Sequence, residues 1–113
     1  MTTAGMPAIR ELFDLNGGGR EAIPRQLAIE WSKRGIRVNS IAPCQFMTPG
    51  LRAVMEDPQF DPEKLMRTWN ENIPLGRVGE AWEIIGPVLF LASDASSMVT
   101  GVCLPVDGGY LAR

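Results

Sequence analysis

The chain contains the stretch Gly35-Ile36-Arg37-Val38-Asn39-Ser40-Ile41-Ala42-Pro43, in which branched residues cluster between a glycine and a proline. Residues branched at the β-carbon favour strands, and glycine and proline are typical of the turns at either end of a strand. Both faces of the stretch carry only moderately polar residues, as in a strand that is covered on both sides. We therefore expect a β-strand at residues 36–42, with Pro43 ending its hydrogen-bond ladder.

The residues before this strand predict a helix at residues 20–34. Ile23, Leu27 and Trp31 recur every four residues, so they share one face of that helix. The glycine that follows stands where a left-handed residue would close the helix. Residues 1–19 carry only a weak pattern and form a poorly specified lead-in, whose last three residues are glycines typical of a turn or hinge. The domain proper is expected to span residues 20–113.

A second helix is predicted at residues 62–72, because Asp61 can cap its first turn and Pro62 suits the first helical position. A shorter helix around residues 51–55 is expected before it, ended by an Asp-Pro pair. Segments of this kind above the carboxyl edge of a sheet commonly act as lids.

The most apolar helix is predicted at residues 79–93. We expect it to be kinked at Pro87 and buried against two partners. Glu80 and Glu83 at its start are explained by the helix dipole. Residues 102–106 predict a last, short edge strand, parallel to the first. The expected fold is α/β, a partial Rossmann-like fold with two parallel strands.

The composition narrows the classes of function. A length of 113 residues fits one small domain, and a net charge of -2 gives no electrostatic reason to expect nucleic acid or a membrane as partner. The absence of histidine excludes imidazole catalysis and histidine ligation, so no metal site is predicted. Cys44 and Cys103 lie far apart without a Cys-x-x-Cys spacing, and no apolar run approaches the length of a membrane span. A reducing, cytoplasmic setting is expected.

From about residue 20 onward the chain resembles the carboxyl-terminal part of the short-chain dehydrogenase/reductase family. Many short matches occur in the right order and cover most of the chain, which is more specific than any single motif. The matching segments are residues 27–31, 35–43, 74–77, 90–94, 100–101 and 106–109. Residues 51–61 also look like those of sugar-acid and polyol members.

The resemblance implies a doubly wound dinucleotide-binding fold and reversible hydride transfer between NAD or NADP and an alcohol or carbonyl. It also implies that Pro43, the backbone around Phe46 and Met47, and the hydroxyl of Thr48 touch the nicotinamide end of the cofactor. A loop that leaves a strand tip offers free N–H groups and a hydroxyl for such contacts. The alternative is that Thr48 merely starts the next helix. Cys44 stands beside this site where the family commonly has glycine; its simpler interpretation is a small, semi-buried apolar residue.

The residues that react in this family are absent from the sequence. The family uses a Tyr-x-x-x-Lys pair as its acid and base, whereas the only tyrosine here is Tyr110, and neither Lys33 nor Lys64 follows a tyrosine at that spacing. Residues 17–22 fit a Gly-x-Gly-x-x-Ala pattern, but they lack the preceding strand and the later acidic residue of a phosphate-binding loop. No catalytic residue is therefore predicted.

The leading hypothesis is a carboxyl-terminal portion of an NAD(P)-dependent short-chain oxidoreductase, from a truncated or incomplete gene, that is inactive alone. Two strands make a poor sheet unaided, so the chain is expected to be marginally stable or to self-associate. The alternative is a non-catalytic assembly module that docks onto full-length relatives through the helix at 79–93 and the last strand. A third possibility is a small enzyme with Cys44 as nucleophile, although no base lies nearby in sequence.

Overall fold

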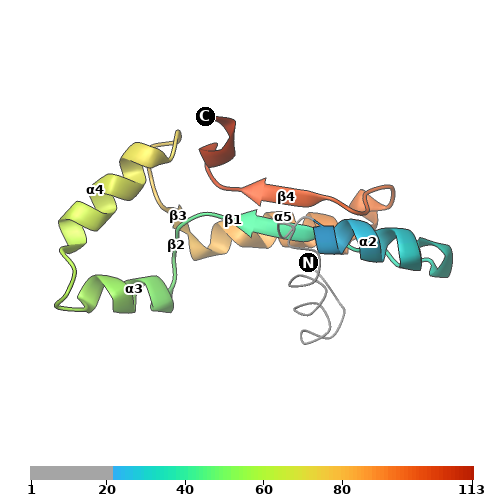
Figure 1. Cartoon of the computed structure of the whole chain (residues 1–113), viewed down its shortest axis with the longest axis horizontal. Helices are drawn as coiled ribbons and strands as arrows, with labels where there is room; N and C mark the ends of the chain where they lie inside the picture. Colours follow the sequence, from blue (N-terminus) through green and yellow to red (C-terminus); the bar gives the residue numbers. More distant parts are fainter. Residues whose placement is uncertain (1–21) are drawn as a thin grey trace. The chain divides into compact units, whose positions relative to one another are not determined.

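The computed structural model describes residues 22–113, which are drawn in colour in Figure 1. The lead-in at residues 1–19 and its glycines lie outside the described residues, so the domain boundary at residue 20 stays a prediction. The chain divides into two compact units. The first holds the described residues up to Ile41 together with Val88–Leu104, and the second holds Ala42–Pro87 and Pro105–Arg113.

The first unit opens with the predicted amphipathic helix. The α-helix α2 (Ala22–Trp31) continues into a 3-10 turn, η1 (Ser32–Arg34), and Gly35 closes both in the left-handed conformation with a φ of 75°. The Gly35 N–H donates to the Ser32 carbonyl at 3.0 Å. This confirms the prediction of a glycine C-cap. From residue 22 onward only the tighter last turn differs from the helix expected at 20–34, and residues 20–21 lie outside the described residues.

The apolar stripe of α2 forms the core of this unit. Ile23, Leu27 and Ala28 pack with the fully buried Val38, and Trp31 lies against the cluster. The four-residue spacing of the stripe places these side chains on one helix face, so the helix forms because that face is covered.

The predicted strand begins later than expected, because side chains replace its first ladder bonds. The Val38 N–H donates to Thr100 Oγ1 at 3.1 Å. The buried Asn39 donates from Nδ2 to the Val99 carbonyl at 3.0 Å and accepts from the Val102 N–H at 3.1 Å. These bonds satisfy the segment without the regular pairing that defines a strand.

Regular pairing occurs between β1 (Ser40–Pro43) and β4 (Cys103–Val106). Their arrows point the same way in Figure 1, so the two strands are parallel, as predicted. Pro43 is the last residue of β1, one position beyond the predicted end. Pro105 is exposed within β4, which agrees with its assignment to an edge strand.

Arg37 holds the carboxyl end of helix α5 (Ile85–Ala92) from within the first unit. Its guanidinium donates to the carbonyls of Leu91 at 2.9 Å, Val99 at 3.0 Å and Ser93 at 3.2 Å. The last carbonyls of a helix have no partner inside the helix, so a cation at this end satisfies them and complements the dipole.

The second unit contains two helices, α3 (Pro49–Glu56) and α4 (Pro62–Asn72), which contact each other. The bounds of α4 equal the prediction because its start is specified locally. Asp61 caps the helix by accepting the N–H groups of Glu63 and Lys64, and Pro62 occupies the first turn.

The apolar segment predicted as one helix at 79–93 is divided in three. Its first residues form the short strand β3 (Gly79–Glu80), followed by the 3-10 turn η2 (Ala81–Ile84) and then α5. Pro87 therefore lies in the first turn of α5, where its missing N–H costs little, and not at a kink inside a long helix.

The expected burial of this segment on two sides is wrong within the described residues. Leu91 of α5 is buried, but Ile85 is 56% exposed and Leu89 is 62% exposed. These two side chains are four residues apart and share one helix face. Within residues 22–113, no helix combines the length and apolar character that a membrane span requires.

Candidate functional site

The site is built on the loop that leaves β1. After Pro43, residues Cys44 and Gln45 lead into the two-residue strand β2 (Phe46–Met47), which pairs in parallel with β3. The Gly79 N–H donates to the Gln45 carbonyl at 3.0 Å and fixes the start of this pairing. One edge of the β2 backbone is therefore occupied by β3, and within the described residues no strand lies on its other edge.

Glycine at position 79 is required by the packing of Phe46. A Cβ atom at Gly79 would lie 2.5 Å from Phe46 Cε1 and 2.6 Å from Cδ1, closer than real Cβ contacts. The register of β2 and β3 places Phe46 directly opposite Gly79. The aromatic ring therefore lies against Gly79, in the space that a side chain at this position would fill.

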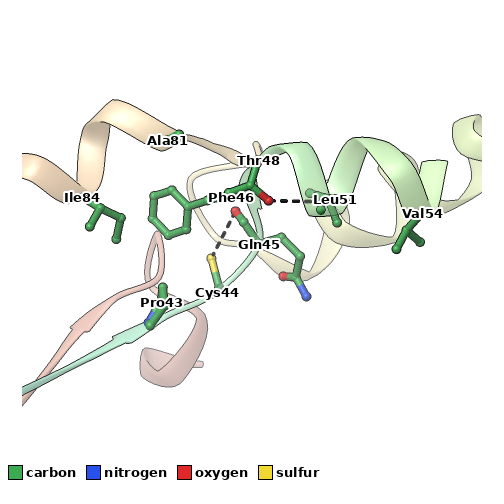
Figure 2. A pocket seen from close by; sticks show the side chains of 10 residues that line it. Pro43, Cys44, Gln45, Phe46, Thr48, Leu51, Val54, Ala81 and Ile84 are labelled. Atoms are coloured by element: carbon green, nitrogen blue, oxygen red, sulfur yellow. Dashed lines mark hydrogen bonds between the residues drawn. The ribbon is translucent and has the colours of Figure 1, made fainter. Parts of the chain in front are cut away.

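An open pocket of about 600 Å³ lies beside this loop. Figure 2 shows its walls: Leu51 and Val54 come from α3, while Ala81 and Ile84 come from η2 on the opposite side. Most of the wall is apolar. The loop contributes Pro43, Cys44, Gln45, Phe46 and Thr48.

Four of the five residues predicted to bind a cofactor thus line one pocket, and Met47 is not among its lining residues. Met47 lies in β2, half-buried and opposite Glu80. Sequence analysis did not find Leu51, Val54 or Ile84, because apolar residues in helices carry no signal that separates a pocket wall from a core.

Thr48 has a defined local role. It is the N-cap of α3, and its Oγ1 accepts the Leu51 N–H at 3.2 Å, the bond drawn in Figure 2. Thr48 therefore does start the next helix, as the alternative states. The hydroxyl acts as acceptor in this bond, which leaves its hydrogen available as a donor to a ligand. Capping and ligand binding are compatible in this geometry.

The surroundings of Cys44 disfavour its thiolate form. Burial raises the pKa of the Cys44 thiol above its ordinary value, and the negative charge of Asp107 raises it further. The thiol lies 3.9 Å from the Gln45 carbonyl oxygen, to which it donates. A catalytic cysteine needs the thiolate, which a raised pKa disfavours at neutral pH. This argues against the third possibility, an enzyme with Cys44 as nucleophile.

Asp107 closes the turn predicted after β4. Its Oδ1 accepts the Gly109 N–H at 3.0 Å and its Oδ2 accepts the Leu111 N–H at 3.1 Å. Both oxygens therefore accept hydrogen bonds from the local backbone, as expected for an aspartate before two glycines. Among residues 22–113, no cluster of three or more cysteine, aspartate or glutamate side chains could hold a metal ion.

One feature of the site was missed by sequence reasoning. Glu83 joins a capping box with Glu80 and also pairs with Arg77, with two N–O distances of 2.8 Å. The spacing of Glu80 and Glu83 indicates a helix start, but it does not reveal the partner of Glu83, which is Arg77 on the other side of β3. The Arg77 guanidinium and the Glu80 N–H lower the pKa of the Glu83 carboxyl to about 2.

Comparisons with known proteins agree with this geometry. The family model described as enoyl-(acyl carrier protein) reductase matches residues 12–111. The chain is 40% identical over 109 residues to a galactitol 2-dehydrogenase (L-tagatose-forming) of Cereibacter sphaeroides, covering 96% of this chain and 41% of that protein. It is 42% identical over 95 residues to an L-xylulose reductase of Bos taurus, covering 84% of this chain and 37% of that protein. The chain thus spans about two-fifths of the length of these curated relatives.

The chain is also similar to solved structures of dehydrogenases. A putative short-chain alcohol dehydrogenase from Sinorhizobium meliloti superposes with a TM-score of 0.71 and 41% identity, over 84% of this chain and 36% of that one. A putative 2-deoxy-d-gluconate 3-dehydrogenase from Agrobacterium tumefaciens, solved with bound NADP, has a TM-score of 0.69 and 40% identity, over 82% of this chain and 36% of that one.

Proposed function

This chain belongs to the short-chain dehydrogenase/reductase family, and we propose that it forms the part of an NAD- or NADP-dependent oxidoreductase that receives the nicotinamide end of the cofactor. The observation that carries the proposal is the loop of residues 43–48, which leaves the carboxyl end of β1 and lines the pocket with its own side chains. In open α/β sheets, ligands bind outside the carboxyl ends of the strands.

The residues present suit this group. The apolar side chains of Phe46 and Leu51 offer a surface for a flat ring, and the Thr48 hydroxyl can donate to a carboxamide or phosphate oxygen. Pro43 ends the strand and so turns the loop towards the pocket. When bound, the nicotinamide supplies or accepts the hydride of the reaction. The chain's own part is to hold and orient that group and to exclude water from it.

We also propose that these 113 residues do not catalyse the reaction by themselves. These 113 residues contain no Tyr-x-x-x-Lys pair. A positioned acid or base contributes a factor of about 100 to 10,000 to such a rate, and no described group near the pocket replaces it. The substrate is an alcohol or carbonyl compound, and the cytoplasmic setting stays a prediction.

A chimera tests the cofactor role. Residues 22–113 would replace the matching part of the galactitol 2-dehydrogenase, which supplies the remaining elements of an intact enzyme. We expect this chimera to oxidise an alcohol with NAD or NADP, while the chain alone shows neither turnover nor tight stoichiometric binding. Turnover by the chain alone would refute the proposal that it is inactive.

Variants of Thr48 in the chimera separate the two roles of that residue. Thr48→Ser keeps both the helix cap and the hydroxyl donor. Thr48→Asp keeps the cap but cannot donate when ionised and repels phosphate, so we expect a cofactor KM at least about tenfold higher, the effect of losing one charge-sensitive hydrogen bond. Equal KM values for the two variants would show that the hydroxyl does not touch the cofactor.

A second candidate function is subunit assembly through α5. Its exposed Ile85 and Leu89 lie one turn apart, and such a pair on a surface helix favours a protein partner. We expect the chain to self-associate or to co-purify with a full-length relative, and Leu89→Glu to abolish this. Phe60→Glu is the matched control, because Phe60 is 45% exposed outside α5. A monomer by light scattering that also fails to bind a relative would exclude this function.

A further inference from the structure

The pocket beside the loop has two apolar walls. Leu51 and Val54 lie three residues apart on α3, so they share one helix face, and both line the pocket. Ala81 and Ile84 line it from η2, as Figure 2 shows. We call these four residues the apolar walls. Val54 is 40% exposed, so the described residues leave part of this surface open to a ligand.

The charged side chains of the same elements do not line the pocket. Arg52 and Glu56 belong to α3, and neither is a lining residue. Glu83 belongs to η2, but its carboxylate bonds to Arg77 and lines a different cavity together with that arginine. Within residues 22–113, no charged side chain therefore lines the pocket. A carboxylate placed against the apolar walls would lose its water without gaining a counter-charge.

The polar side chains that line the pocket all come from the loop. They are the Cys44 thiol, the Gln45 amide and the Thr48 hydroxyl, which lie between the two walls in the view of Figure 2. A ligand hydroxyl beside the loop can therefore find a hydrogen-bond partner. A hydroxyl against the apolar walls would lose its bonds to water and find no side-chain partner there, which is unfavourable. The pocket thus suits a ligand with one polar end.

Hydride transfer requires the substrate to lie against the nicotinamide, with the reacting atoms about 3–3.5 Å apart. The substrate of the proposed enzyme therefore enters the same pocket, whose volume of about 600 Å³ is typical of small-molecule sites. We propose that the apolar walls receive the carbon skeleton of the substrate, which is an alcohol or carbonyl compound with an apolar remainder and not a polyol or a sugar acid. The inference rests on the proposed cofactor role and adds the class of substrate. It separates this chain from the relative that is named for galactitol, a polyol.

The test uses two probes that share the same carbon ring. Cyclohexanol carries a single hydroxyl on this ring, whereas inositol carries a hydroxyl on every carbon. Each probe is titrated into the full chain, and binding is followed by NMR through the methyl signals of valine, leucine and isoleucine. We expect cyclohexanol to shift the signals of Val54 and Ile84 with a dissociation constant of about 10 mM, as suits a ligand of so few atoms. Inositol, and gluconate as an acidic probe, should bind at least about tenfold more weakly.

Two valines with similar exposure supply matched variants. Val54→Thr replaces a methyl group in the pocket with a hydroxyl, so we expect it to weaken cyclohexanol binding about fivefold. Val102→Thr makes the same replacement at a residue that is 38% exposed and does not line the pocket, so it should leave the affinity unchanged. Ile84→Val removes one methyl group from the opposite wall and keeps an apolar residue, so it tests the proposal even if a threonine variant fails to fold. It should weaken binding about threefold.

The proposal is overturned if cyclohexanol shifts neither Val54 nor Ile84, or if inositol or gluconate binds as tightly as cyclohexanol. It is also overturned if Val102→Thr weakens binding as much as Val54→Thr does, since the effect would then not belong to the pocket.

A separate titration with nicotinamide mononucleotide distinguishes this inference from the cofactor role. The mononucleotide should shift the amide signals of Phe46 and Thr48. If it shifts neither while cyclohexanol still binds at Val54 and Ile84, the cofactor role fails and the apolar walls remain a site for an apolar alcohol. If the mononucleotide binds but cyclohexanol and inositol bind equally, the cofactor role stands and the class of substrate is wrong.

Discussion

The Arg77 guanidinium meets the Glu83 carboxylate through two parallel hydrogen bonds of 2.8 Å each. Glu83 Oε2 also accepts the Glu80 N–H at 2.7 Å, so one carboxylate joins the residue before β3 to the turn after it. Between them lie Gly79, which packs on Phe46, and Ala81, which lines the pocket. The ion pair therefore supports the wall of the candidate site that the loop of β1 does not supply.

This pair predicts a pH dependence of stability. Its hydrogen bonds lower the pKa of the Glu83 carboxyl from 4.5 to about 2, so the folded state binds a proton less readily than the unfolded chain. The stabilisation is fully present above pH 4.5 and is lost as the pH falls towards 2. We expect the difference in melting temperature between the native chain and Glu83→Gln to shrink across this window.

The size of this effect should be modest. The side chains of Arg77 and Glu83 are 54% and 24% exposed, so solvent and salt screen the pair. Glu71→Gln is the control, because the Glu71 side chain on α4 makes no hydrogen bond or ion pair with the described residues. The role assigned to the carboxylate would be contradicted if the difference in melting temperature between the native chain and Glu83→Gln stayed constant from pH 7 to pH 2.5.

Gly79→Ala should destabilise the chain through Phe46. The added methyl group cannot fit 2.5 Å from Cε1, so the ring must move, and such overpacking costs about 1–3 kcal/mol in the free energy of unfolding. Urea denaturation measures this loss.

Gly86→Ala is the matched control for that experiment, since a Cβ there meets nothing within 4 Å. Alanine is the better helix former, so this change in α5 should be neutral or stabilise by up to about 1 kcal/mol. Equal effects of the two substitutions would show that the Phe46 contact does not restrict position 79.

Asp61→Ala should weaken α4 at its start. It removes the acceptor for the N–H groups of Glu63 and Lys64, which costs about 1 kcal/mol in a typical helix. Asp61→Asn keeps the cap and loses only the charge, so it should retain most of the stability. Circular dichroism during urea unfolding distinguishes the two, and an equally unstable Asn variant would assign the effect to charge.

Arg37→Met should destabilise the first unit. It removes three hydrogen bonds from a charged donor to the carbonyls of Leu91, Val99 and Ser93, which keep Asn39 or Ser96 as donors, so we expect a loss of about 2 kcal/mol in the free energy of unfolding. Arg37→Lys keeps the positive charge but not the planar group of donors, so it should retain only part of the lost stability. Arg34→Met, at an exposed position in η1, should change the unfolding free energy little.

Local elements could be predicted from the sequence to the residue. The start of α4 depends on Asp61 and Pro62, the end of η1 on Gly35, and the last turn on Asp107. Each signal is a bond between a side chain or amide and backbone within about four residues. Such bonds form wherever the local sequence is placed, so no knowledge of the tertiary structure was needed.

The loop of the candidate site could also be predicted from the sequence. The strand ending at Pro43 and the resemblance that follows it led to Pro43, Cys44, Phe46 and Thr48, which line one pocket. The residues of α3 and η2 across the pocket could not be predicted, because an apolar residue gives the same sequence pattern whether it faces a core or a cavity.

What the sequence by itself determined was therefore the helices α2 and α4, the strands β1 and β4, the caps at Gly35 and Asp61, the turn at Asp107, and the family. Only the tertiary structure decided where β1 begins, which glutamate Arg77 meets, and that Gly108 lies against Ile73. The physical reason is distance along the chain: Asn39 takes its partners from residues 99 and 102, and Gly108 approaches Ile73. Contacts of this separation carry no local pattern, and they exist only once the chain has folded.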